Sequence, residues 1–104
     1  MKYALITGGS RGIGRAIAIK LAKQGYAVVI NYLNNDEAAK QTLEQIVAEG
    51  GQAELLRFDV GQPEAIEQAV EEWQQRHPDE YIDVLVNNAG IRRDNLMVFM
   101  QNEE

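Results

Sequence analysis

The amino-acid sequence predicts an α/β domain in which helices cover both faces of a parallel sheet. Short apolar runs alternate with longer segments of helical periodicity, and no repeat or low-complexity linker interrupts the alternation. Strands that are separated by helices run parallel, because each crossover returns the chain to the same edge of the sheet. The composition, 45% hydrophobic and 25% charged, is that of a globular protein. We therefore expect residues 1–104 to belong to one domain.

Four apolar runs are the predicted strands. They cover residues 2–7, 27–32, 53–60 and 84–87. Right-handed crossovers place these strands in the order 3-2-1-4, which is the first half and a little more of a three-layer α/β/α, Rossmann-like fold. The sequence is expected to be truncated after the fourth strand of that fold. The outer edge of this strand is then expected to be unpaired.

The predicted helices lie between these strands. The first, from residue 13 to Gly25, carries apolar residues at four-residue spacing. The second, over 37–49, follows capping residues at 34–36. The third runs from Pro63 to Arg76, and Asp94 is expected to cap a last helix at the end of the chain.

Charge and composition exclude several classes of function. The chain has no cysteine, so disulfides, thiolate metal sites and cysteine nucleophiles are excluded, and no metal site is predicted. No apolar run approaches the ~20 residues of a membrane span. The net charge is −6, yet residues 1–35 contain five bases and no acid. We expect a cytoplasmic protein that binds neither nucleic acid nor membrane, but takes a small anion near its N-terminal end.

Residues 7–14, TGGSRGIG, predict a phosphate-binding turn between the first strand and the first helix. Glycines let the backbone approach a ligand, and the N-terminus of a helix attracts anions. A nucleoside-triphosphate loop is excluded, because Arg15 and Ala16 stand where that loop needs lysine and a hydroxyl. The G-x-G-x-x-G fingerprint also fails, since Ile17 takes its last position. A glycine turn with a purely structural role stays the alternative.

A second motif, NNAG at residues 87–90, ends the fourth strand. In the predicted order this strand lies beside the first strand, at the point where the strand order reverses. Ligands of open α/β sheets bind at this point, outside the carboxyl ends of the strands. The two motifs therefore converge on one crevice.

TGGSRGIG followed by NNAG resembles the classical short-chain dehydrogenases/reductases, and the resemblance covers the whole chain. Within that family, the run NNAGIRRDNLMVFMQNEE is similar to the 3-oxoacyl-acyl-carrier-protein reductases. The resemblance implies hydride transfer from a nicotinamide cofactor to a β-ketoacyl thioester, held on acyl carrier protein, in fatty-acid synthesis. It also implies a homo-oligomer. An acetoacetyl-CoA reductase and a non-catalytic dinucleotide-binding module are the alternatives.

The resemblance also implies which residues hold the cofactor. Those that wrap its pyrophosphate and adenosine ribose are Gly8, Ser10, Arg11, Gly12, Ile13 and Gly14. Those that flank the adenine ring are Asp59, as acceptor from the amino group, and Val60. Those that line the ribose side are Asn88, Ala89 and Gly90, with Asn87 tying neighbouring strands together. The alternative for Asp59 is that it caps the end of a strand, and the alternative for Val60 is that it packs in the core. Thr7 is expected to have a mainly structural role.

The end of the second predicted strand indicates which dinucleotide binds. An NAD site usually places an acid there for the ribose 2′-hydroxyl, whereas residues 30–33 contain none. Arg11 can pair with a 2′-phosphate through charge-assisted hydrogen bonds, and Asn31 can donate to it. The sequence therefore predicts NADPH.

The chain offers no catalytic residue of the family. The family uses a serine and a tyrosine with a lysine four residues later, on the same helix face. None of Tyr3, Tyr26, Tyr32 and Tyr81 has lysine at that spacing. We expect an N-terminal portion that lacks the catalytic half and is inactive alone. Among the other residues, Trp73 is expected to pack in the core and His77 to lie in solvent at a helix end.

Overall fold

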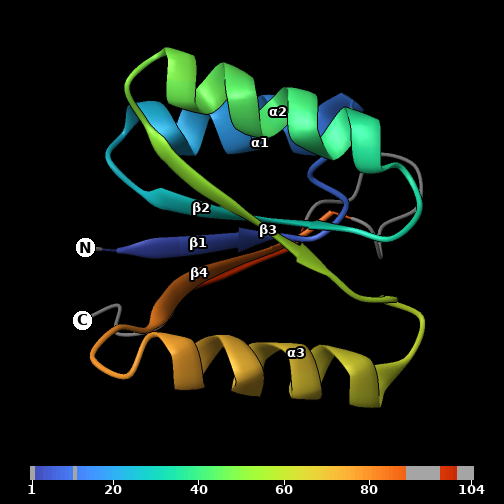
Figure 1. Cartoon of the computed structure of the whole chain (residues 1–104). Helices are drawn as coiled ribbons and strands as arrows, with labels where there is room; N and C mark the ends of the chain where they lie inside the picture. Colours follow the sequence, from blue (N-terminus) through green and yellow to red (C-terminus); the bar gives the residue numbers. More distant parts are fainter. Residues whose placement is uncertain (1, 11, 89–96, 101–104) are drawn as a thin grey trace.

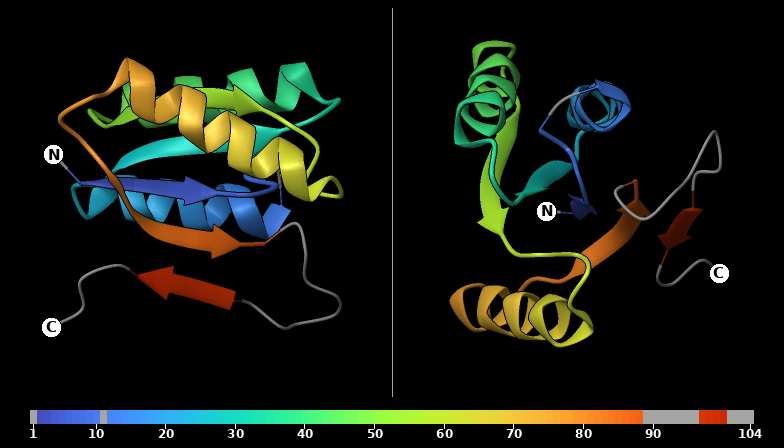
Figure 2. Two further views of the ribbon diagram at one scale, coloured as in Figure 1. Left: turned by 90° about the horizontal axis from the view of Figure 1, so that it is seen from below. Right: turned by 90° about the vertical axis from the view of Figure 1, so that its right-hand side faces the viewer.

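The computed structural model describes residues 2–10, 12–88 and 97–100, with side chains described as far as residue 88. A sheet of five strands lies between two layers of helices, with α1 and α2 on one face and α3 on the other (Figures 1 and 2). The elements, in chain order, are β1 Tyr3–Ile6, α1 Gly12–Lys23, β2 Ala27–Tyr32, α2 Asp36–Ala48, β3 Gln52–Arg57, α3 Pro63–Arg76, β4 Ile82–Asn87 and β5 Met97–Met100. None of the helices within the described residues is long and apolar enough to cross a membrane.

The sheet has the order β3-β2-β1-β4-β5, so the predicted order 3-2-1-4 is confirmed. The first four strands run parallel, with Leu5 paired to Val29 on one side and to Leu85 on the other. Strand β3 ends at Arg57, three residues before the predicted end. The carboxyl ends of β1 and β4 consequently lie side by side. This is the arrangement in which the glycine turn and the NNAG motif can meet at one crevice.

The prediction of a last helix is wrong where the structure describes that region. Residues 97–100 form β5, which runs antiparallel beside β4 (Figure 2). Leu85 of β4 is in register with Phe99 of β5. The free N–H and C=O groups along the outer edge of β4 offer this segment a full set of hydrogen-bond partners. That edge is therefore paired instead of open. Asp94, the expected cap, lies outside the described residues.

Two apolar cores explain why β1 and the first four residues of β2 are apolar without alternation. Side chains alternate between the faces of a sheet, and here both faces are covered. The core beneath α1 and α2 contains Ala4, Ile6, Ala18, Val28, Ile30, Ile46, Val84 and Val86. The core above α3 contains Leu5, Val29, Leu56, Phe58, Ala69 and Trp73.

The apolar stripe of α1 enters the core only in part. Ile17 and Leu21 pack against it, whereas Ile13 is 58% exposed. A four-residue step exceeds one helical turn by about 40°, so the stripe rotates away from the sheet over two steps. Ile13 is left free at the first turn of α1, next to the glycine turn.

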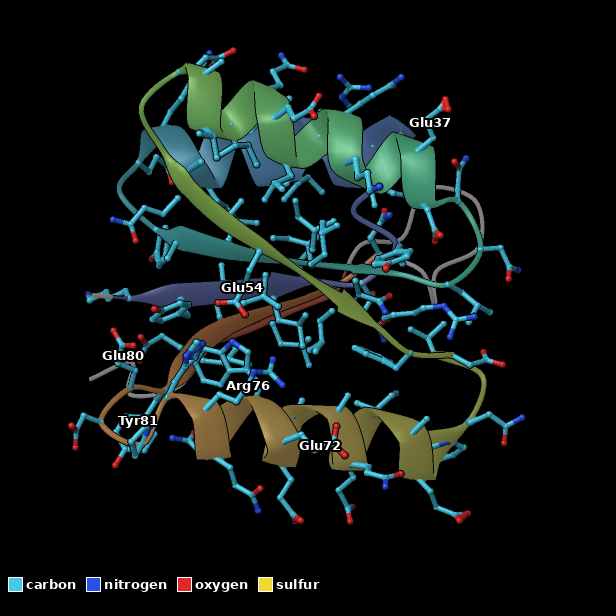
Figure 3. The ribbon with its side chains drawn as sticks, in the orientation of Figure 1. Glu37, Glu54, Glu72, Arg76, Glu80 and Tyr81 are labelled. Carbon is cyan, nitrogen blue, oxygen red and sulfur yellow. The ribbon has the colours of Figure 1, made fainter. Side chains whose placement is uncertain are left out.

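Aromatic and charged side chains gather at the amino ends of the strands. The Trp73 ring meets Tyr3 edge-on at 4.9 Å and His77 at 4.3 Å, and Trp73 is fully buried as expected. The His77 Nε2 lies 3.2 Å from the Glu54 Oε2, and Arg76 reaches toward the same carboxylate (Figure 3). The expectation that His77 lies in solvent is wrong, because these rings cover it.

Tyr3 is a partly buried phenol whose surroundings favour its protonated form. Its hydroxyl donates to the Glu80 Oε1 at 3.0 Å. Burial, this hydrogen bond and the charges of Glu80 and Glu54 raise the pKa of Tyr3. A raised pKa in the folded state favours the protonated phenol. Its contribution to stability is complete below the unfolded pKa of about 10 and is lost as the pH rises through the folded value.

We therefore expect the free energy of unfolding to fall above about pH 10, and to fall less steeply in Tyr3→Phe. Urea denaturation followed by circular dichroism at pH 8 and about pH 11 measures the difference. Tyr81→Phe is the control, because Tyr81 is 63% exposed. Equal pH dependence in Tyr3→Phe and in the unmodified chain would contradict the assignment.

Candidate functional site

The turn between β1 and α1 is held by three other elements of the fold. Gly8, with φ of 63°, donates its N–H to the Asn31 Oδ1 of β2 at 3.0 Å. Its carbonyl oxygen accepts from the Asn88 Nδ2, just after β4, at 3.1 Å. The Ser10 carbonyl oxygen accepts from the Thr42 hydroxyl of α2 at 2.7 Å. The turn therefore has a fixed shape before any ligand arrives.

Gly14 brings the turn and the residues after β4 together. It is buried in the first turn of α1, against the Gly8 carbonyl and the Asn88 amide. A Cβ at this position would overlap the Gly8 carbonyl oxygen and lie 2.7 Å from the Asn88 Nδ2. The glycine is needed for close packing of helix, turn and strand end, which is the convergence that the two motifs predict.

Asn31 plays a different part from the expected one. It is 2% exposed, and its Nδ2 donates to the carbonyl oxygens of Phe58 at 3.0 Å and Leu56 at 3.3 Å. With both N–H groups engaged on β3 and beyond, the side chain has none left for a phosphate. The expectation that Asn31 donates to a 2′-phosphate is contradicted by these contacts. Asn31 instead links the turn to the ends of β2 and β3.

Sequence reasoning missed Thr42. Its side chain is completely buried in α2, and its hydroxyl reaches the Ser10 carbonyl 32 residues away. A threonine in line with the apolar positions of an amphipathic helix is the signal that the sequence offered. The hydroxyl also contacts the Ala38 carbonyl at 3.1 Å, one helical turn back. Thr42 therefore fixes the position of Ser10 against α2.

Thr42→Val is expected to weaken the binding of an anionic ligand at the glycine turn while the chain still folds. Valine keeps the shape of threonine but leaves the buried Ser10 carbonyl without its donor, at a cost of about 1–3 kcal/mol in the free energy of unfolding. A displaced Ser10 also shifts the ligand-binding backbone. Calorimetric titration below the melting temperature measures the affinity. Thr42→Ser, which keeps the hydroxyl, is the control, and equal affinities of the two variants would contradict the role.

A cavity of about 270 Å³ opens beside the turn. Its lining comes from the glycine turn, the end of β2 with the loop that follows, and the segment after β3. The lining residues are Gly8, Ser10, Asn31, Tyr32, Leu33, Asn34, Asn35, Phe58, Asp59 and Val60. The cavity thus unites the predicted phosphate-binding turn with both residues that were predicted to flank an adenine.

Asp59 and Val60 both make the structural contacts that were their alternative roles. The Asp59 Oδ1 accepts from the Gly61 N–H at 2.8 Å and closes the turn that leads into α3. Val60 packs against the core above α3. Both also line the cavity beside the glycine turn. A structural contact on one side of each residue is compatible with a ligand contact on the other.

The ends of β1 and β4 are joined by side chains. The Thr7 hydroxyl lies 3.3 Å from both the Val86 carbonyl oxygen and the Asn87 Oδ1. This contact ties the two strands together, which is the role expected of Asn87 and Thr7. Gly12 and Ile13 are exposed at the start of α1. Three predicted site residues, Arg11, Ala89 and Gly90, lie outside the described residues.

A second cavity, of about 260 Å³, lies near the C-terminal ends of α1 and α2. Lys23 and Glu49 pair with each other there at 3.6 Å, and the remaining lining is apolar or glycine. Among the described residues that line it, none comes from the first turn of a helix. The cavity beside the glycine turn is therefore the better candidate for an anionic ligand.

A glycine turn at the carboxyl end of β1, beside the reversal of strand order and next to an open cavity, is the arrangement with which doubly wound α/β domains bind dinucleotides. The family model described as short chain dehydrogenase matches residues 2–104. The chain belongs to this family of oxidoreductases, which use nicotinamide dinucleotides.

Named relatives agree with the family. The chain is 40% identical to the 3-oxoacyl-acyl-carrier-protein reductase FabG of Staphylococcus epidermidis and 42% identical to the 3-oxoacyl-acyl-carrier-protein reductase of Synechocystis, in each case over 99% of this chain. It spans 41% of the length of these relatives. The versicolorin reductase stcU of Emericella nidulans is 43% identical over 86% of this chain and 33% of its own.

Solved structures share the fold. A dehydrogenase/reductase of Sinorhizobium meliloti is 47% identical, with a TM-score of 0.77 over 86% of this chain and 35% of its own. A metagenomic short-chain oxidoreductase in complex with NADP is 40% identical, with a TM-score of 0.77 over 86% of this chain and 39% of its own.

Proposed function

We propose that this chain is the NADPH-binding part of a 3-oxoacyl-acyl-carrier-protein reductase. The observation that carries the proposal is the cavity that joins the glycine turn to the end of β2. Residues 31–35, which line that side, include no acid to bind a ribose 2′-hydroxyl or to repel a 2′-phosphate. The identity of 40–42% with 3-oxoacyl-acyl-carrier-protein reductases supports the choice of enzyme.

The described residues fit a dinucleotide. The absence of a side chain at Gly14 lets the first turn of α1 pack directly against the Gly8 carbonyl, so that α1 begins directly after the turn. In our proposal Gly8, Ser10 and Gly12 hold the pyrophosphate through the turn and the start of the helix. Asp59 and Val60 hold the adenine. Arg11, which the structure does not describe, pairs with the 2′-phosphate.

NADPH, when bound, supplies the hydride that reduces the carbonyl of a β-ketoacyl thioester. We assign to this chain the binding and orientation of that cofactor and no catalytic residue, because none of its tyrosines has a lysine four residues later. The substrate carried on acyl carrier protein and the assembly into a homo-oligomer belong to the same proposal.

Calorimetric titration with NADPH and NADH tests the cofactor. We expect NADPH to bind at least about tenfold more tightly, and the preference to shrink in Arg11→Ala. Equal or tighter binding of NADH would overturn the assignment. The substrate is tested in an active reductase that includes these 104 residues. The rate of NADPH oxidation is measured with 3-oxoacyl thioesters of acyl carrier protein and of coenzyme A. Faster turnover of the coenzyme A thioester would favour an acetoacetyl-CoA reductase instead.

A further inference from the structure

Arg57 is a charged side chain that neither the motifs nor the core account for. It is the last residue of β3 and is exposed. Its Nε donates to the Leu33 carbonyl oxygen at 2.9 Å. Leu33 follows β2 directly and lines the cavity beside the glycine turn. The guanidinium is therefore held beside one of the residues that line the cavity, although Arg57 itself is not a lining residue.

The pairing of the strands gives the same placement. Arg57 is in register with Tyr32, the last residue of β2, and neighbours in a parallel pair project from the same face of the sheet. In doubly wound folds the end of the second strand is where the substituent on the ribose 2′ position is recognised. Arg57 thus stands beside the segment 32–35, which carries no acid and lines the cavity.

The charge of Arg57 is available for a ligand. No acidic side chain within the described residues forms an ion pair with Arg57. By contrast, Arg76, the last residue of α3, pairs with Glu54 at 3.9 Å. The bond to Leu33 engages one of five N–H groups. The other four have no partner among the residues that the structure describes. A guanidinium held by its Nε still presents both terminal nitrogens, the pair that binds phosphate oxygens.

We propose that Arg57 is a specificity-determining residue that recognises the 2′-phosphate of the dinucleotide from the β3 side of the cavity. This inference rests on the proposed function and adds to it a contact that the glycine turn does not supply. The Leu33 carbonyl sets the position of the guanidinium, so the preference for a 2′-phosphate depends on a side chain from a strand that carries none of the family motifs.

The test compares two nucleotides that differ only in the phosphate, adenosine 2′,5′-bisphosphate and 5′-AMP, by calorimetric titration of the chain. Arg57→Gln is expected to lower the affinity for the bisphosphate about five- to tenfold and to change the affinity for 5′-AMP by less than about twofold. Its bisphosphate affinity should also depend less on salt. Arg57→Lys keeps the positive charge but loses the paired N–H groups of the guanidinium. Its affinity for the bisphosphate should lie between those of the unmodified chain and Arg57→Gln. Arg76→Gln is the matched control and should change neither affinity.

Each outcome decides between the proposals. Selective loss of bisphosphate binding in Arg57→Gln supports the role of Arg57. If the unmodified chain prefers the bisphosphate and Arg57→Gln keeps that preference, or lowers both affinities equally, the role is overturned and the proposed cofactor stands. If the unmodified chain shows no preference for the bisphosphate, the cofactor assignment fails and the role of Arg57 fails with it.

Discussion

Gly14→Ala is expected to abolish dinucleotide binding and to destabilise the domain. The new methyl group would overlap the Gly8 carbonyl oxygen and crowd the Asn88 amide that donates to it. Neither can move aside easily, because the first is a backbone atom and the second is held by its hydrogen bond to that atom. Overpacking and the loss of the part-buried hydrogen bond from the Asn88 amide together lower the free energy of unfolding by about 3 kcal/mol or more. Because the displaced atoms form the turn itself, the affinity for NADPH should fall by about a hundredfold or more.

Gly25→Ala separates the two effects. Gly25 has φ of 100°, and no atom lies within 4 Å of the position where its Cβ would be. Alanine there is strained by about 1–2 kcal/mol but displaces nothing near the cavity. Urea denaturation and calorimetric titration of both variants should show loss of stability in each and loss of binding in Gly14→Ala alone. Similar affinities would mean that Gly14 has only a structural role.

Trp73→Ala is expected to have the largest effect on folding. Trp73 is fully buried in the core above α3 and contacts the rings of Tyr3 and His77. Removal of a buried tryptophan side chain costs about 3–5 kcal/mol, a large part of the 5–15 kcal/mol that stabilises a typical domain. We expect a chain that is largely unfolded at moderate urea concentrations, as followed by circular dichroism.

Trp73→Phe is the matched variant. The indole Nε1 has no hydrogen-bond partner among the described residues. Substitution by phenylalanine therefore removes part of the buried ring surface but breaks no hydrogen bond. Its loss of stability should be clearly smaller than that of alanine. Since Trp73 does not line the cavity, the folded fraction of either variant should bind NADPH with unchanged affinity. A loss of less than about 1 kcal/mol in Trp73→Ala would contradict the packing described above.

The strand order was predictable because alternation of strands and helices, with right-handed crossovers, leaves few topologies. The meeting of the glycine turn and Asn88 followed from that order and needed no side-chain detail. The contacts of Thr42 and Arg57 were not predictable, because each joins residues 24 or more positions apart through the packing of helix or strand. The short run that forms β5 has no periodicity of its own, and its conformation is decided by the free edge of β4.

The anchoring of the glycine turn makes ligand binding and local unfolding a single linked equilibrium. Thr42, Asn31 and Asn88 attach the turn to α2, β2 and β4, so none of these elements can open without releasing it. A nucleotide bound to the turn stabilises the closed state by RT ln(1 + [L]/Kd). Amide hydrogens in α2 around Thr42, which does not line the cavity, should therefore exchange with solvent more slowly when the nucleotide is bound.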